Sequence, residues 1–123
     1  MFLENKIIWQ KIPALDAFKS KLPEYSGVYV FMTADRVANI PFNLKTYYVG
    51  KTNNLKLRFG QHLDPWKSHN KDLFSMLNSK KKQKFEFWYS KISEDQIDAL
   101  EKKLIKTLKP KFNIILRSNH DNK

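Results

Sequence analysis

The segment Tyr47–His62, YYVGKTNNLKLRFGQH, carries the densest set of side chains that could do chemistry. Its tyrosines and histidine can exchange protons, and its lysine and arginine can bind an anion. Arg58 follows Tyr48 by ten residues, and His62 follows Arg58 by four. Because residues four apart lie on the same face of a helix, one helix would present both Arg58 and His62 to a single ligand. The segment indicates a site that binds an anion and moves a proton beside it.

A second candidate is Glu101, in a helix predicted over residues 93–108. The apolar stripe of this helix consists of Ile97, Leu100, Leu104, Ile105 and Leu108. At 100° per residue, Glu101 falls about 40° from the first of these, inside the stripe. A carboxylate on a core face costs free energy unless something compensates its charge. Two interpretations stay open: a buried salt bridge to Arg58 or Lys51, or a metal ligand or catalytic carboxylate that faces the Tyr47–His62 segment.

Taken singly, the candidate residues also have ordinary structural explanations. A helical arginine such as Arg58 commonly lays its stem on the surface and keeps its charge in water. His62 could be a half-buried histidine with satisfied hydrogen bonds. Tyr29, Tyr47 and Tyr48 lie in segments rich in β-formers, where tyrosine is a common packing residue. By strand alternation Tyr47 should face away from Tyr48.

Three short segments have the composition of strands. Residues 27–32 (GVYVFM) are a continuous apolar run, and residues 46–49 (TYYV) end at a glycine. Residues 85–90 (FEFWYS) alternate between two faces. Residues 33–45 are polar and predict a hairpin connection longer than usual.

Helical patterns surround these strands. One helix is predicted over residues 13–22, and another after a cap at Asn53 or Asn54. A short helix is predicted within residues 66–77. The helix over residues 93–108 has the clearest signals, with a capping box at its start and a proline after its end. Residues 1–12 are expected to pack on the domain as an N-terminal segment.

Composition limits the class of protein. The chain has 123 residues, no cysteine, a net charge of +11 and a pI near 9.8. Structural disulfides and cysteine zinc sites are therefore excluded, and we expect one globular domain over residues 1–123. No apolar run reaches membrane-spanning length and the N-terminus lacks a signal-peptide pattern, so we expect a soluble, cytoplasmic protein. The positive charge favours a polyanionic partner, which in such a compartment usually means nucleic acid.

Together these residues match a known pattern. Its parts, in chain order, are Gly27-Val28-Tyr29, Tyr48-Val49-Gly50-Lys51, Arg58, His62, Glu101 and Lys109-Pro110-Lys111-Phe112-Asn113. This pattern resembles the GIY-YIG nuclease family over residues 27–113, with residues 1–26 as an N-terminal extension and residues 117–123 as a flexible tail. Val28 and Val49 replace isoleucine, and the long connection around residues 35–45 could be an insertion that touches substrate or a partner.

The resemblance implies a fold of α+β type within the broad α/β class. It has a small, three-stranded, mainly antiparallel sheet flanked by helices, here with an extra N-terminal helix. It also implies a metal-dependent endonuclease that hydrolyses phosphodiester bonds, with DNA favoured over RNA. Mg²⁺ is the expected cofactor, with Mn²⁺ as a substitute, and Glu101 is its expected protein ligand.

The resemblance also implies roles for the remaining site residues. Arg58 would bind a phosphate oxygen, and Tyr48 would act as the general base with Tyr29 as a second phenol. His62 would relay the proton or bind phosphate, and which of these three is the base stays open. Further substrate contacts are expected from Lys51, Asn113, Lys80, Lys81 and Lys82, with Asn113 positioning the site and not reacting.

Two rival functions remain. A non-catalytic nucleic-acid-binding module could keep a nuclease-like fold, although it would be expected to have lost one or more of the site residues. A basic protein-interaction domain would show no DNA binding whose affinity falls steeply with salt concentration. We expect no membrane partner, and a homodimer is one route to double-strand cleavage. The sequence does not fix the target sequence or structure.

Overall fold

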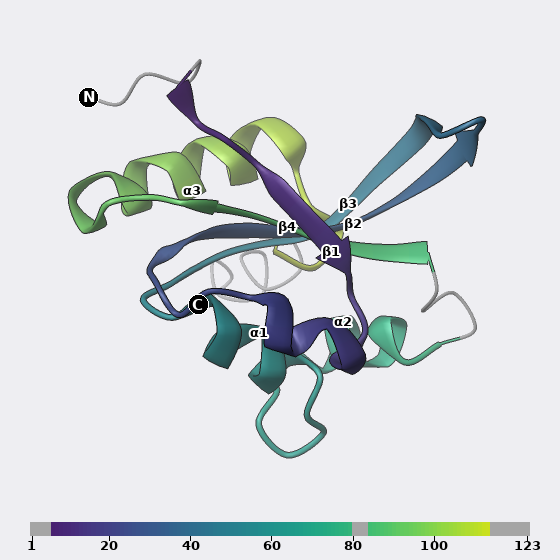
Figure 1. Cartoon of the computed structure of the whole chain (residues 1–123), viewed down its shortest axis with the longest axis horizontal. Coiled ribbons are helices and arrows are strands. Elements are labelled where there is room, and N and C mark those ends of the chain that lie inside the picture. The colour runs from purple at the N-terminus through teal and green to yellow at the C-terminus, as the bar shows by residue number, and fades with distance from the viewer. Residues whose placement is uncertain (1–5, 80–83, 114–123) are drawn as a thin grey trace, which may run out of the picture.

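The computed structural model describes residues 6–79 and 84–113 (Figure 1). At its centre lies one four-stranded antiparallel sheet with the strand order β1-β4-β2-β3. The strands are β1 (Gln10–Pro13), β2 (Gly27–Val37), β3 (Ile40–Thr52) and β4 (Phe85–Lys91). The predicted strands all form, and the antiparallel α+β fold is confirmed.

The prediction of three strands was wrong, because β1 adds a fourth. Its four residues, QKIP, pair with Glu86–Tyr89 of β4. A segment this short and this polar has no strand signal of its own. Its extended conformation depends on the partner strand, which the local sequence does not show.

Helices cover both faces of the sheet. Figure 1 shows α1 (Leu55–His62) and α2 (Lys71–Leu77) on one side and α3 (Glu94–Leu108) on the other. Alternating residues of β2 supply the two cores: Tyr29 and Phe31 pack toward α1 and α2, whereas Val28 and Val30 pack toward α3. The large aromatic side chains thus gather on the α1 face.

The extra N-terminal helix predicted over residues 13–22 is shorter than expected. Only Asp16–Lys21 are helical, and they form a 3-10 helix whose N-cap, Leu15, makes no side-chain hydrogen bond. An aliphatic residue at this position cannot satisfy the first N–H groups, so the segment remains a short, tight turn.

The connection predicted over residues 33–45 is also different. Both strands continue through it and meet in a two-residue turn at Ala38 and Asn39, which have φ values of 52° and 70°. Positive φ at both positions matches the right-handed twist of a hairpin. Pro41 obscured this in the sequence, but β3 is an edge strand, where proline is tolerated.

The helix α3 begins and ends where predicted, but its capping box does not form. The Ser93 hydroxyl donates to the Asp95 carboxylate, and no side chain caps the helix. Ile97 and Leu100 of the predicted stripe are buried, whereas Leu108 is exposed. In the part of the chain that the structure describes, no helix is long and apolar enough to cross a membrane.

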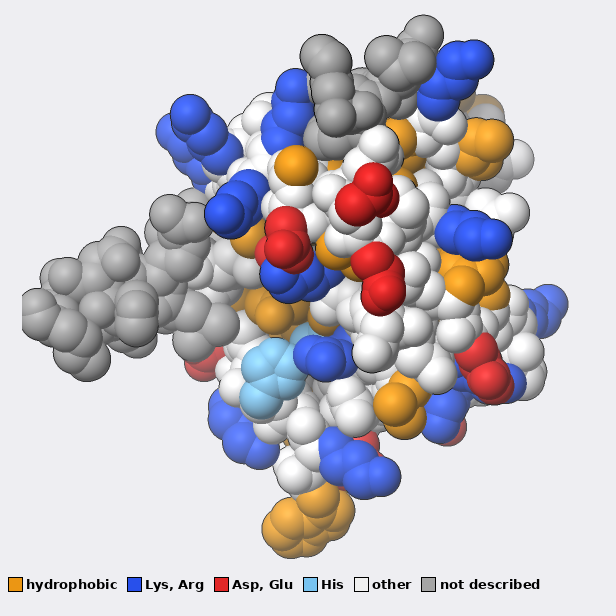
Figure 2. Space-filling view, turned by 90° about the vertical axis from the view of Figure 1, so that its left-hand side faces the viewer, with side chains coloured by type: hydrophobic (Ala, Val, Ile, Leu, Met, Phe, Trp, Pro, Cys, Tyr) orange, Lys and Arg blue, Asp and Glu red, His pale blue; other side chains and the backbone are white. Residues whose placement is uncertain are grey.

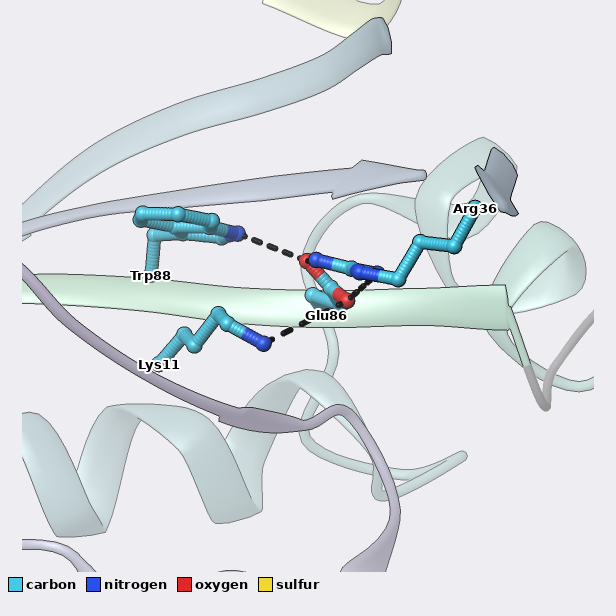
Figure 3. Close-up of polar contacts among 4 residues, drawn as sticks. All are labelled: Lys11, Arg36, Glu86 and Trp88. Atoms are coloured by element: carbon cyan, nitrogen blue, oxygen red, sulfur yellow. Dashed lines mark hydrogen bonds and ion pairs between the residues drawn. The ribbon is translucent and has the colours of Figure 1, made fainter. Parts of the chain in front are cut away.

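A polar cluster ties the β2–β3 hairpin to the sheet (Figure 3). The Glu86 carboxylate accepts hydrogen bonds from the Arg36 guanidinium and from Trp88 Nε1 at 3.0 Å, and Lys11 Nζ lies 3.9 Å away. Burial tends to raise the pKa of Glu86, but the hydrogen bonds from Arg36 and Trp88 and the nearby positive charges lower it below its usual value. The ionised form of Glu86 therefore stabilises the fold.

Replacing Glu86 tests this cluster. The Glu86 carboxyl has a lower pKa in the folded protein than in the unfolded chain. Its contribution to the free energy of unfolding is therefore fully present above the ordinary carboxyl pKa, and it is lost as pH falls through the lowered pKa. We expect Glu86→Gln to reduce the free energy of unfolding at pH 7 by about 1 kcal/mol, and by less at pH 3. Urea denaturation at the two pH values measures both.

The matched control is Lys11→Met, which removes the longest and most exposed ion pair of the cluster and a cation–π contact of 6.0 Å with Trp88. It should change stability little. Equal stabilities of the wild type and Glu86→Gln at pH 7 would contradict the role assigned to the carboxylate.

Candidate active site

The first part of the site is the start of α1. The Asn54 side chain accepts a hydrogen bond from the Leu57 N–H at 3.0 Å, so the predicted cap at this position is confirmed. Arg58 is half-buried, and His62 is fully buried at the end of the helix. Capping thus fixes the rotation that turns both residues toward the sheet.

Tyr29 and His62 make a short, buried polar contact. Tyr29 Oη lies 2.6 Å from His62 Nε2, and both side chains are only 1% exposed. The Tyr29 ring occupies the space above Gly50, its pairing partner on β3: a Cβ on Gly50 would lie 2.4 Å from the Tyr29 hydroxyl. Gly50 is therefore required by this close approach.

Burial sets the protonation states of this pair. It raises the pKa of Tyr29 well above the usual phenol value, the Tyr48 hydroxyl raises it further, and the Arg58 guanidinium opposes both effects. Burial lowers the pKa of His62 to about 3, with His69 and Arg58 acting in the same direction. At neutral pH the two side chains form a neutral hydrogen-bonded pair. Arg58, with its fixed charge, is the nearby group that would stabilise a phenolate.

Tyr48 lies beside this pair. Its ring centroid is 6.2 Å from that of Tyr29 and 5.3 Å from that of His62. Burial raises the pKa of Tyr48, the charge of Glu101 raises it further, and Arg58 lowers it. The two tyrosines predicted for the site therefore share one histidine and one arginine.

Strand alternation predicted that Tyr47 would face away from Tyr48. This prediction was wrong, because both side chains lie on the same face of the sheet. Phe31 pairs with Tyr48 and Met32 with Thr46, so Tyr47 is an extra residue at a break in the register. Such a bulge interrupts the alternation. Tyr47 and Tyr48 consequently belong to the same buried cluster, where Tyr47 packs on Phe85 and Phe112 away from His62.

Glu101 reaches the site from α3, on the other face of the sheet. Its side chain is 19% exposed, and Oε1 lies 3.9 Å from Lys51 Nζ, which also contacts Asp98. Burial raises the pKa of Glu101. Its negative charge also raises the pKa of both Tyr29 and Tyr48, so the carboxylate lies within electrostatic reach of the phenols.

The Glu101 carboxylate fits a hard divalent cation. A distance of 3.9 Å is too long for a hydrogen bond, so Lys51 compensates its charge only in part. Within residues 6–79 and 84–113, no group of three or more His, Cys, Asp or Glu side chains could hold a metal ion together. A site here would use one protein carboxylate with water and phosphate oxygens, as Mg²⁺ sites do.

The Asn113 side chain binds the backbone of β3 next to the site. Its Oδ1 accepts from the Val49 N–H at 2.7 Å, and its Nδ2 donates to the Val49 carbonyl at 2.9 Å. The amide thus completes the edge strand β3 next to Tyr48. This arrangement supports the positioning role and leaves Asn113 a poor candidate for direct contact with substrate.

A hollow of about 390 Å³ opens beside these residues. Among its lining residues are Lys51, Arg58, Glu94 and Asp98, from the end of β3 and the helices α1 and α3. Figure 2 shows acidic, basic and histidine side chains gathered on this face. Of the substrate-binding residues predicted from the sequence, Lys80, Lys81 and Lys82 lie outside the described residues.

The sequence reasoning missed His69. Its ring centroid lies 5.4 Å from that of His62, and it is exposed in the loop between α1 and α2. Burial and the Arg58 charge lower its pKa. Because His69 belongs to no periodic segment, its only signal was its position just before the Asn70 cap of α2.

Comparison with known proteins places the chain in a family. The sequence model of one protein family, the GIY-YIG catalytic domain, matches residues 25–113. The chain therefore belongs to the GIY-YIG family, and the resemblance seen in the sequence is confirmed. UvrABC system protein C of Hydrogenobaculum sp. (strain Y04AAS1) is 34% identical over 102 residues, and that of Clostridioides difficile (strain 630) is 36% identical over 101 residues.

These matches cover 82% and 80% of the chain but only 16% and 14% of the two relatives, so the chain spans about a sixth of their length. The GIY-YIG N-terminal endonuclease domain of UvrC from Thermotoga maritima, solved with bound magnesium, has a TM-score of 0.52 and 24% identity. The match covers 80% of this chain and 97% of that one. It shows that the two share a fold.

The neutral state of His62 is directly measurable. Because burial keeps its pKa near 3, we expect its imidazole ¹⁵N shifts to stay at neutral values between pH 7 and pH 5. In the unfolded chain His62 takes up a proton near pH 6.5, whereas in the folded protein it does so only near pH 3. His62 therefore lowers the free energy of unfolding as pH falls from about 7 toward 3.

The matched comparison is Tyr29→Phe, which removes the hydrogen bond but keeps the aromatic packing. Its His62 should remain neutral at pH 5, since burial is the main cause of the shift. Protonation of the wild-type His62 at pH 6 would contradict the assignment.

Proposed function

We propose that this domain is a Mg²⁺-dependent endonuclease that hydrolyses phosphodiester bonds in DNA, with Mn²⁺ able to replace Mg²⁺. The observation that carries the proposal is the Tyr29–His62 hydrogen bond, set beside Arg58 and within the field of Glu101. An acid–base pair, a phosphate-binding cation and a lone carboxylate are the groups that metal-assisted phosphodiester hydrolysis needs. The solved relative bound to magnesium has the same fold.

Glu101 would hold the metal ion. When bound, Mg²⁺ would stabilise charge on the leaving 3′-oxygen. Lys51 lies close enough to the carboxylate to bind an adjacent phosphate oxygen, and Asp98 holds the lysine in place. The raised pKa of Glu101 reflects a buried negative charge, which a divalent cation would relieve.

Arg58 would bind the scissile phosphate. Arg58 lines the hollow that opens to solvent, and its charge lowers the pKa of both buried phenols, so it acts on the tyrosines and faces the hollow at once. A planar fork of donors can hold two phosphate oxygens at once. The same charge favours the phenolate form of a neighbouring tyrosine.

The attacking water would lose its proton to Tyr29. The Tyr29 hydroxyl can pass its own proton to His62 Nε2 as it accepts one from water, so that no free phenolate has to form first. Tyr48 is the alternative base, because its ring lies equally close to His62. His69 lies next to His62 and is exposed, although it makes no hydrogen bond to His62 Nδ1.

The rival function is a non-catalytic nucleic-acid-binding module with the same fold. Tyr29, Tyr48, Arg58, Glu101 and Asn113 are all present, and the first four act on one another electrostatically. In a binding module the buried tyrosine–histidine pair would serve packing alone. One site cuts one strand, so double-strand cleavage would need a homodimer or two successive cuts.

Plasmid cleavage tests the proposal. Supercoiled plasmid should be nicked with Mg²⁺ and stay intact with EDTA. We expect Glu101→Gln to reduce nicking at least about 100-fold while DNA binding persists, since only the metal ligand is lost. Arg58→Lys should also lose about 100-fold, because it keeps the charge but not the fork.

Circular dichroism of both variants shows whether the fold is kept. Unchanged nicking by Glu101→Gln would exclude Glu101 as the metal ligand, and salt-sensitive binding without any cleavage by the wild type would favour the rival function. A parallel RNA substrate tests the choice of DNA.

The base is tested by two matched variants. If Tyr29 is the base, Tyr29→Phe should lower the single-turnover rate at least about 100-fold, and Tyr48→Phe by about 10-fold or less. The reverse order would assign the base to Tyr48. Equal small losses would exclude both tyrosines.

A further inference from the structure

A second cavity, of about 590 Å³, lies outside the site described above. Its walls come from the N-terminal segment, the end of β4 and the start of α3, and include Lys6, Ile8, Tyr25, Tyr89, Lys91 and Gln96. Two lysines and no acidic residue are among the described residues that line it. The cavity therefore offers aromatic surface and positive charge together.

This cavity is separated from the catalytic hollow by a narrow rim. Tyr25 lines the cavity, and the next residue, Ser26, lines the hollow. In α3, Gln96 lines the cavity and Ile97 lines the hollow. A strand bound in one would meet the other after crossing the rim. The two hollows are therefore adjacent on the surface.

Hydrogen bonds fix the rim to both neighbouring elements. The Tyr25 carbonyl accepts from the Leu55 N–H at 3.1 Å, at the start of α1. The Ser26 hydroxyl donates to the Ile92 carbonyl at 3.0 Å, where β4 leads into α3. Because Leu55 begins the helix that carries Arg58, the position of Tyr25 is coupled to that of the phosphate-binding arginine.

The aromatic wall already binds a cation. Lys91 Nζ lies 5.1 Å from the centroid of the Tyr25 ring, a cation–π contact. Tyr25 is partly buried against the aromatic core, so its ring is held while one part stays accessible. A base could stack on such a ring, and the displaced lysine could then bind a phosphate.

We propose that this cavity binds a nucleotide of the substrate strand that flanks the scissile phosphate, with its base on Tyr25 and its phosphate at Lys91 and Lys6. The inference rests on the proposed nuclease function and adds a subsite to it. Stacking on tyrosine does not discriminate strongly between bases, so the subsite would favour an unstacked or single-stranded nucleotide over a particular sequence.

The test uses single-stranded oligonucleotides that carry 2-aminopurine at successive positions, bound to the Glu101→Gln variant so that no cleavage occurs. We expect the fluorescence to respond strongly at one position only. Tyr25→Ala in the same background should weaken binding roughly tenfold and abolish that response, whereas Tyr25→Phe should keep both. Lys91→Ala should reduce the slope of log K against log salt by about one.

The matched control is Leu108→Ala, which removes an exposed apolar side chain at the end of α3, outside the cavity. It should leave affinity and fluorescence unchanged. Unchanged binding by both Tyr25→Ala and Lys91→Ala, or a response at every position, would overturn the subsite. A wild type that does not nick plasmid would instead count against the nuclease function. Failure of the subsite and failure of the nuclease function can be told apart, because binding is measured without cleavage.

Discussion

Tyr29 joins three elements of the fold through its contacts with Gly50 and His62. The phenol crosses from β2 over the one residue of β3 that has no Cβ and ends 2.6 Å from a histidine of α1. Any side chain at position 50 would occupy the space of the hydroxyl. Two strands and a helix are therefore fixed relative to one another by a single buried side chain, which we also propose as the reacting base, with Tyr48 as the alternative.

The sheet separates the groups that the reaction needs, and its edge brings them together again. His62 and Arg58 belong to α1 on one face, whereas Glu101 belongs to α3 on the other. Lys51, on the edge strand β3, contacts the acidic side of α3. Asn113 binds both backbone groups of Val49 and so fastens the chain after α3 to the same strand. The site is consequently formed where the two layers meet.

The sequence predicted most of this arrangement from local signals. Asn54 and the apolar spacing of α1 and α3 placed Arg58, His62 and Glu101 correctly, because caps and helical periodicity act over a few residues. The fourth strand was missed because β1 is extended only through its pairing with β4. The hairpin was predicted, but the extension of both strands to a two-residue turn was missed, because the polar residues and Pro41 look like a loop when the neighbouring strand is unknown.

The candidate site was predicted less completely than the fold. The interruption of alternation at Tyr47 depends on a mismatch between two strands, and no single-strand pattern reveals it. His69 lies in a loop, so only the folded chain brings it to His62. The low pKa of His62 likewise follows from burial among Tyr29, Phe31 and Tyr48, which is a property of packing.

We propose that one metal ion binds at Glu101, at the seam between α3 and the edge of the sheet. Paramagnetic broadening by substoichiometric Mn²⁺ in ¹H–¹⁵N spectra measures this position directly. We expect selective broadening around Glu101, Asp98 and Lys51 in the wild type, and its loss in Glu101→Gln. Broadening centred on another acidic group, such as Glu86, or the same broadening in both proteins, would contradict it.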